Sequence, residues 1–146
     1  MTRIDFYILP EGGPAAGIQV LTACKLCDKA IAAGHRIYAN VPDVAAAEEL
    51  DMALWTVRQG SFIPHERYDG RTAPAEPLPT VLIGRDEPPE THHGVMLNLG
   101  LEVPDFFSRF ERVLEIVAPD AQGRAKSRER YRYYRDRGYE LATHNL

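Results

Sequence analysis

The segment IDFYILPEGG (residues 4–13) mixes aromatic and β-branched side chains and then stops at a proline and two glycines. This composition predicts a β-strand that ends in a turn. From Gly17 to Ala33 the apolar positions change to the spacing of a helix. The residues that repeat along one face of this predicted helix are Val20, Cys24, Cys27 and Ile31.

The same alternation follows a second time. Gly34 suits the C-terminal cap of the first helix, and residues 35–41 have the composition of a second strand. Asp43 is the expected N-cap of a second helix, whose inner face consists of Val44, Ala47, Leu50 and Leu54. Strand, helix, strand and helix in this order predict a single α/β domain over residues 1–146, with a mostly parallel central sheet flanked by helices.

The second half of the chain continues this pattern after a loop. Residues 69–79 are rich in proline and glycine and predict a surface loop. The elements expected after it are strands at residues 80–83, 95–99 and 113–117, a short helix that starts at Pro104, and a final helix over residues 121–137.

Charge is distributed unevenly along the 146 residues, whose formal net charge is −4. From Arg124 onward the chain has seven basic residues and only three acidic ones. An acidic body with a basic end predicts one localised anionic partner, not a general coat for nucleic acid.

The composition also bears on the compartment. The sequence has no stretch of about 18 uncharged apolar residues, the length that a membrane span needs. It shows no basic start followed by an apolar signal core. Two cysteines are too few for a disulfide framework. We therefore expect a cytoplasmic protein.

Motifs for catalysis are weak. The turn at residues 10–17 has neither residue order of a phosphate-binding loop, and Glu11 would repel a phosphate there. Cys24-Lys25-Leu26-Cys27 matches C-x-x-C, but a zinc site needs four ligands, and the only histidine pair, His92-His93, lacks the required spacing. Two buried thiols in the helix core are the preferred interpretation. We expect no catalysis, no cofactor and no metal; a nucleotide-dependent enzyme is the remaining alternative, supported by strand–helix alternation alone.

One face of the predicted final helix is basic. At about 100° per residue, the residues that share this face are Arg124, Arg128, Tyr131, Arg132 and Arg135. A tyrosine among arginines is typical of interface hot spots, and a guanidinium group suits carboxylates. The face therefore fits an acidic peptide with a free C-terminal carboxylate. Two alternatives stay open: a merely solvated basic face, and direct binding of single-stranded nucleic acid.

A second candidate surface surrounds the single tryptophan. Trp55 follows Leu54 and therefore points about 100° away from the inner face of the second helix. A further apolar group, Phe62-Ile63-Pro64, follows shortly after it in the chain. This group is either part of the core or a docking patch, and the sequence does not choose between them.

These two surfaces carry a resemblance to a known family. The segments LDMALW (residues 50–55) and SFIPH (residues 61–65), together with RERYRYYR (residues 128–135), resemble the chi subunit of bacterial DNA polymerase III. Phe6-Tyr7-Ile8-Leu9 fits the same family, so the likeness extends along the whole chain. The proline-rich loop and the two cysteines depart from the family pattern as we understand it.

The resemblance implies a Rossmann-like fold and an accessory subunit of the clamp-loader complex that has no catalysis of its own. Members of this family connect the clamp loader, through the psi subunit, to the single-stranded-DNA-binding protein, so contact with nucleic acid is indirect. By similarity, the acidic C-terminal tail of that protein would dock at Arg124, Arg128, Tyr131 and Arg132, with Val117 in the pocket wall. The surface toward psi, or toward another clamp-loader subunit, would consist of Trp55, Phe62, Ile63 and Pro64.

Overall fold

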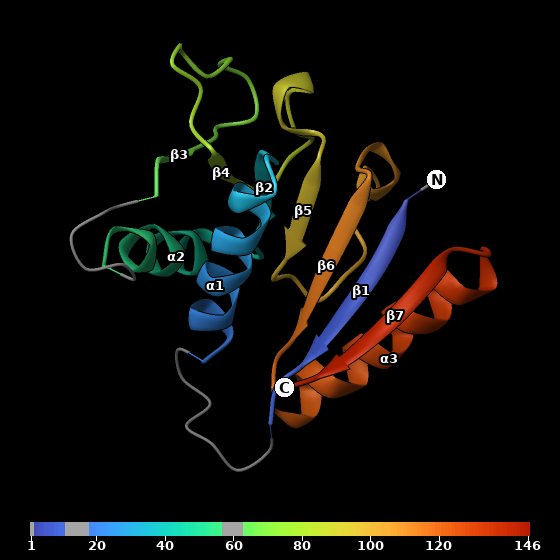
Figure 1. The fold of residues 1–146 in the computed structure, drawn as a ribbon. Helices are drawn as coiled ribbons and strands as arrows, with labels where there is room; N and C mark the ends of the chain where they lie inside the picture. Colours follow the sequence, from blue (N-terminus) through green and yellow to red (C-terminus); the bar gives the residue numbers. More distant parts are fainter. Residues whose placement is uncertain (1, 11–17, 57–62) are drawn as a thin grey trace.

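The computed structural model describes residues 2–10, 18–56 and 63–146. Seven strands and three α-helices follow one another along this part of the chain (Figure 1). In chain order they are β1 (Arg3–Ile8), α1 (Ile18–Ala32), β2 (Ile37–Asn40), α2 (Val44–Thr56), β3 (His65–Arg67), β4 (Val81–Gly84), β5 (Val95–Asn98), β6 (Arg112–Val117), α3 (Ala121–Asp136) and β7 (Glu140–Asn145). Two single turns of 3₁₀ helix, η1 (Glu90–His92) and η2 (Phe107–Arg109), lie in the connections before β5 and β6.

The strands form one sheet in the order β3-β4-β2-β5-β6-β1-β7, and each neighbouring pair is parallel. The predicted α/β fold with a mostly parallel sheet is thereby confirmed. From β1 through β2 to β3 the chain moves toward one edge of the sheet, whereas from β6 to β7 it moves toward the other. Right-handed crossovers then place α1 and α2 on one face and α3 on the opposite face, as Figure 1 shows.

Alternating side chains of the strands supply two separate cores. On β2, Ile37 and Ala39 point into the core beneath α1 and α2, while Tyr38 points into the core beneath α3. The same alternation holds on β4 and β5, because successive side chains of a strand leave opposite faces. Both faces of the central strands are therefore apolar, as is usual for a covered parallel sheet.

The first half of the chain follows the predictions closely. Asp43 accepts a hydrogen bond from the backbone N–H of Ala46 at 2.8 Å, so it caps α2 as expected. Gly34 has φ of +88° just after α1, the left-handed conformation in which a helix-terminating glycine is favoured. Cys24 and Cys27 are buried free thiols in the core beneath α1. Val44 was wrongly assigned to the inner face of α2, since 51% of it is exposed.

Three elements of the second half differ from the predictions. The short helix expected from Pro104 is a single 3₁₀ turn that begins at Phe107. The strands β3 and β7, which form the two edges of the sheet, were not predicted at all. Residues 113–117 do form a strand, β6, as their β-branched composition indicated.

Candidate functional site

The helix α3 begins at Ala121, shortly after β6 ends at Val117. Asp120 is its N-cap, with a side-chain oxygen that accepts the backbone N–H of Gly123 at 2.6 Å. Gly123 has no room for a side chain, because an added Cβ would lie 2.6 Å from the Cβ of Ala118. The first turn of α3 is therefore held tightly against the carboxyl end of the sheet.

A buried polar network fixes the inner face of α3. Glu115 of β6 is fully buried, and its carboxylate accepts hydrogen bonds from Nε of Arg130 at 2.9 Å and from the hydroxyl of Tyr134 at 2.7 Å. The side-chain amide of Asn98 donates to the same carboxylate from β5. Burial raises the pKa of Glu115, and the guanidinium of Arg130 opposes that effect. Arg130 thus belongs to the interior, although the sequence groups it with the other basic residues near the C-terminus.

This anchoring determines which side chains of α3 face solvent. The buried positions of the helix are Gly123, Ser127, Arg130 and Tyr134. Arg128 and Arg132, one turn apart on the other side, are exposed. Within the described ranges neither of them has a carboxylate at ion-pair distance. Two guanidinium groups are consequently available to an anionic partner.

The remaining residues of the predicted basic face lie closer to the protein body. Tyr131 is half-buried, with its ring centroid 5.4 Å from that of Phe6. Arg124 is also half-buried and donates hydrogen bonds to the backbone oxygens of Pro119 and Leu9, both at 3.2 Å. Val117 is buried in the same core that Tyr131 packs against. The structure therefore places Val117 and Tyr131 in one apolar cluster beneath α3, and it holds the half-buried Arg124 against the backbone beside the first turn of the helix.

Two other cations of α3 are already paired. The ammonium group of Lys126 lies 3.1 Å from Glu102 and 3.5 Å from Glu129, and the hydrogen bond with Glu102 raises its pKa. Arg135 lies 3.3 Å from the carboxylate of Asp136. The open part of the basic face is thus limited to Arg128 and Arg132 with Tyr131 between them.

The second predicted surface lies on α2 near the other edge of the sheet. Trp55 is 54% exposed, and its ring meets that of His65 edge-on with centroids 5.0 Å apart. His65 also contacts the carboxylate of Asp51, with 2.5 Å between Nε2 and Oδ1. Pro64 is exposed, whereas Ile63 is buried in the core beneath α2. Phe62 lies outside the described residues.

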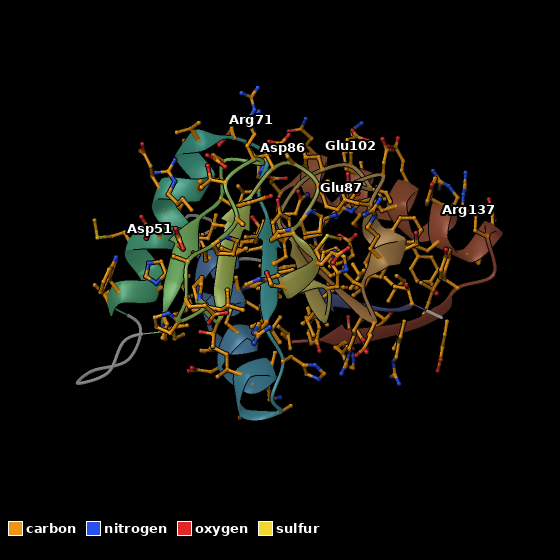
Figure 2. All side chains as sticks on the ribbon, turned by 90° about the horizontal axis from the view of Figure 1, so that it is seen from above. Asp51, Arg71, Asp86, Glu87, Glu102 and Arg137 are labelled. Carbon is orange, nitrogen blue, oxygen red and sulfur yellow. The ribbon has the colours of Figure 1, made fainter. Side chains whose placement is uncertain are left out.

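The two surfaces are far apart. Asp51 on α2 and Arg137 just after α3 lie at opposite ends of the molecule (Figure 2). The sheet order agrees, since β3, which follows α2, is one edge strand, and β7, which follows α3, is the other. Both surfaces are therefore accessible at the same time.

The chemistry available elsewhere is limited. Burial raises the pKa of the Cys24 thiol to about 11, and burial also raises that of Cys27. Across residues 2–10, 18–56 and 63–146, no group of three or more His, Cys, Asp or Glu side chains is placed to hold a metal ion. In the same part of the chain, no helix combines the length and apolar character needed to cross a membrane.

Comparisons with known proteins extend over the whole chain. The family model of the DNA polymerase III chi subunit, HolC, matches residues 1–142. The chain is 40% identical to the DNA polymerase III subunit chi of Pseudomonas aeruginosa over 146 residues, which cover 100% of this chain and 98% of that protein. It is 28% identical to the subunit chi of Haemophilus influenzae over 142 residues, with 97% and 96% covered. The subunit chi of Escherichia coli is 25% identical over 145 residues, with 98% and 97% covered.

Proposed function

Because this chain belongs to the DNA polymerase III chi-subunit family, we propose that it is a non-catalytic accessory subunit of the polymerase III clamp loader, and that α3 binds the acidic C-terminal tail of the single-stranded-DNA-binding protein. The observation that carries this proposal is the pair of exposed, unpaired guanidinium groups of Arg128 and Arg132, with Tyr131 between them, found within the described part of the chain. The carboxylates of the tail would pair with these arginines. Its terminal phenylalanine would pack against the apolar surface formed by Tyr131 and Val117.

The strength of such a contact follows from its parts. Burying one phenylalanine side chain against Tyr131 contributes about 1.5–3 kcal/mol. Each hydrogen bond between a carboxylate and an arginine contributes about 1.5–3 kcal/mol before the cost of ordering the tail is subtracted. One phenylalanine and two such hydrogen bonds give about 4.5–9 kcal/mol before that cost, so the tail should bind with a dissociation constant of about micromolar or weaker. An affinity in this range lets the contact form and release as replication proceeds.

The anchoring of α3 supports the same role. A peptide site must hold its charged groups in fixed positions if a flexible tail is to be recognised. Arg130 and Tyr134 bind the inner face of the helix to Glu115, so the outer residues Arg128 and Arg132 keep a constant spacing. The helix therefore presents a rigid row of donors to the tail.

A peptide-binding experiment tests this proposal. A labelled acidic peptide that ends in a free phenylalanine is titrated with the full chain, and fluorescence anisotropy reports the binding. We expect Arg128→Ala and Tyr131→Ala each to weaken binding about tenfold or more, since each removes an interface hot spot. Lys126→Ala is the matched control on the same helix, because its ammonium group already pairs with Glu102 and Glu129. Wild-type affinity in both test variants contradicts the proposal.

Direct binding of single-stranded nucleic acid by α3 is the competing function. Arginines and tyrosines also bind phosphates and stack on bases. Titration of the chain with a labelled oligonucleotide at about 0.15 M salt, where exposed charges are screened beyond about 8 Å, separates the two. Our proposal expects little binding there, because the rest of the chain is acidic.

The surface around Trp55 is assigned to a second subunit of the same assembly. We propose that Trp55, Pro64 and Phe62 contact psi or another clamp-loader subunit. The predicted contact by Ile63 is wrong, because Ile63 is buried in the core and only 2% of it is exposed. A half-exposed tryptophan is a common anchor of protein interfaces. The helix that holds Trp55, α2, also carries Asp51, which lies at the opposite end of the molecule from Arg137 at the end of α3 (Figure 2). Trp55→Ala should abolish co-purification with the clamp loader while tail-peptide binding stays unchanged. If Trp55→Ala removes both co-purification and peptide binding, or neither of them, the division into two surfaces is contradicted.

A further inference from the structure

A groove runs between α1 and the sheet, from β5 and β6 along β1 to Leu146 after β7, on the face opposite α3. Figure 1 shows that α1 and α2 lie over the other half of this face and leave β1 and β7 open. Two adjoining cavities of about 210 Å³ and 570 Å³ follow the open strip, and both are lined by Tyr7, Leu26 and Lys29. Neither α3 nor the Trp55 surface contributes to either cavity.

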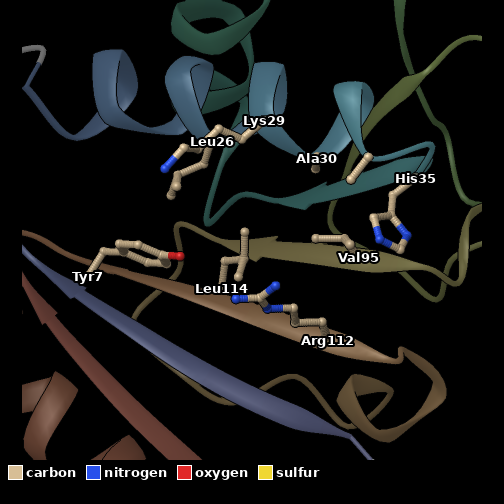
Figure 3. Close-up of a pocket in the computed structure, with 9 residues that line it drawn as sticks. Tyr7, Leu26, Lys29, Ala30, His35, Val95, Arg112 and Leu114 are labelled. Atoms are coloured by element: carbon tan, nitrogen blue, oxygen red, sulfur yellow. The ribbon is translucent and has the colours of Figure 1, made fainter.

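The smaller cavity has a mixed polar and apolar lining. Tyr7 and Arg112 rise from the sheet and face Leu26 and Lys29 of α1, as Figure 3 shows. His35 lines its far end. The groove therefore begins with two cationic side chains and a phenolic hydroxyl that share one opening.

A buried carboxylate on β1 fixes side chains beside the smaller cavity. Asp5 of β1 is fully buried and accepts a hydrogen bond from Nε of Arg112 at 2.7 Å. Nε2 of His144 on β7 lies 2.9 Å from the other oxygen of Asp5, and the ring of His144 stacks on Tyr7 at 4.6 Å. Among the described residues, the two terminal nitrogens of Arg112 have no hydrogen-bond partner, so they remain available for an acceptor in the groove.

The larger cavity is mainly aliphatic. Leu21 of α1 is 47% exposed and Leu146 is 57% exposed, and they line this cavity together. Leu9, Pro10 and Leu26 complete its apolar lining. Large apolar side chains exposed on both walls of one groove indicate a partner that covers them.

The lining of the groove carries more basic than acidic side chains, although the chain as a whole is acidic. Only ten basic residues precede Arg124 in this acidic chain, and three of them, Lys25, Lys29 and Arg112, line the groove. Among the residues that the structure describes, Asp28 is the only acidic one that lines either cavity. Three basic side chains along one groove can consequently steer an anionic partner toward it.

We propose that this groove binds an acidic segment of a partner protein, whose carboxylates meet Lys25, Lys29 and Arg112 and whose bulky apolar side chain fills the cavity between Leu21 and Leu146. This is a third docking surface, separate from α3 and from the Trp55 surface. A flexible peptide suits a groove of this width better than a folded domain does, because an extended chain can place one side chain in the cavity and its neighbours on the rim.

Single-stranded nucleic acid is the weaker candidate for the same groove. Its bases need exposed aromatic faces on which to stack. Of the described residues, Tyr7 alone places an aromatic side chain in the lining of the larger cavity, and its ring stacks on that of His144. The aliphatic walls instead match an apolar amino-acid side chain.

Photo-cross-linking locates the binding directly. The probe is a labelled peptide of aspartate and glycine with one central benzoylphenylalanine and an amidated C-terminus, so that it lacks the free carboxylate proposed for the α3 ligand. We expect irradiation with the full chain to cross-link residues of α1 and Leu146, as mapped by mass spectrometry. Cross-links confined to α3 overturn the proposal.

Two variants and a matched control test which residues of the groove determine its affinity for this peptide. Leu21→Asp and the double variant Lys25→Glu/Lys29→Glu should each weaken binding of this peptide about tenfold or more, since they remove the apolar wall or reverse the charge of the rim. Val44→Asp is the control, because Val44 is a half-exposed apolar residue in the first turn of α2, as Leu21 is in α1, but lies outside the groove. Arg128→Ala should leave this binding unchanged, which separates the result from the proposal for α3.

Three further outcomes overturn the inference. The first is equal binding by all variants, or no binding by the wild type at about 1 mM protein, a concentration that detects even a millimolar dissociation constant. The second is binding of oligothymidylate that Leu21→Asp abolishes, which assigns the groove to nucleic acid. The third is concentration-dependent self-association that Leu21→Asp abolishes, which assigns the groove to a second copy of the chain.

Discussion

Nε of Arg130 donates a hydrogen bond to Oε1 of Glu115 at 2.9 Å, and both side chains are buried between α3 and the sheet. The pair joins the middle of the basic helix to the strand beneath it. Arg130 also donates from its guanidinium to the backbone oxygen of Leu101 at 2.8 Å. The orientation of the proposed tail-binding face therefore depends on an ion pair that the tail itself never touches.

Removing one partner of this pair should destabilise the fold strongly. Arg130→Met leaves the carboxylate of Glu115 buried without its cation, and we expect the free energy of unfolding to fall by about 3–5 kcal/mol. Urea denaturation followed by circular dichroism measures the change. Glu115→Gln added to Arg130→Met should recover part of the loss, since the neutral amide oxygen still accepts from Tyr134. Lys126→Met, which removes an exposed pair, is the control and should leave the midpoint almost unchanged.

Adding a side chain at Gly123, in the first turn of α3, should lower the stability of the fold. Gly123→Ala places a Cβ 2.6 Å from that of Ala118 and 2.8 Å from its backbone oxygen. The helix must then shift outward, at an expected cost of about 1–3 kcal/mol of unfolding free energy. Thermal denaturation tests this, and Ala118→Gly in the same chain should restore part of the melting temperature. An unchanged melting temperature for Gly123→Ala would show that α3 is not held at this contact.

The free energy of unfolding at low pH should depend on the ionisation of Asp5. Burial raises the pKa of Asp5, but the hydrogen bonds from Arg112 and His144 outweigh burial and bring the pKa below its ordinary value of 3.8. The folded protein thus binds this proton less readily than the unfolded chain, so the stabilisation is present above the ordinary pKa and is lost as the pH falls toward the folded value. Asp5→Asn should be less stable than the wild type near neutral pH, and the difference should shrink in strong acid. Unfolding free energies measured across this pH range decide the point; a constant difference contradicts the assignment.

The two thiols should be inert in the folded protein. Burial raises the pKa of Cys24 to about 11 and that of Cys27 as well, so almost no thiolate exists at the pH of a thiol assay. We expect no reaction with Ellman's reagent under native conditions and reaction of both thiols, Cys24 and Cys27, after denaturation. Rapid labelling of either cysteine in the native protein would show that the core beneath α1 opens readily.

The sequence predicted the elements whose residues repeat locally. The helical spacing of Cys24 and Cys27, the cap at Asp43 and the β-branched run of β6 each depend on neighbours a few positions away. The open arginines of α3 belong to this class too, because Arg128 and Arg132 lie one turn apart on the same helix. Periodicity alone therefore predicted a basic face on this helix, but it did not separate the exposed Arg128 and Arg132 from the half-buried Arg124 and the ion-paired Arg135.

Other features depend on partners that are distant in sequence. The strand β7 has no apolar alternation of its own and forms because β1 offers an open edge. The sequence does not distinguish Arg130 from the neighbouring arginines of α3. It is buried because it pairs with Glu115, which lies 15 residues earlier in the chain. Asp5 meets His144 across 139 positions of the chain, which creates the floor of the groove beside Lys29.

Local pattern determined the helices, most of the parallel strands and the basic surface of α3, since the signals for these lie within single segments. Only the tertiary structure decided which arginine is buried, which strands close the edges of the sheet and where the groove with Tyr7 lies. The physical reason is that hydrogen bonds, ion pairs and shared cavities join side chains from separate strands and helices. Their energies exist only after the sheet has brought those segments into register.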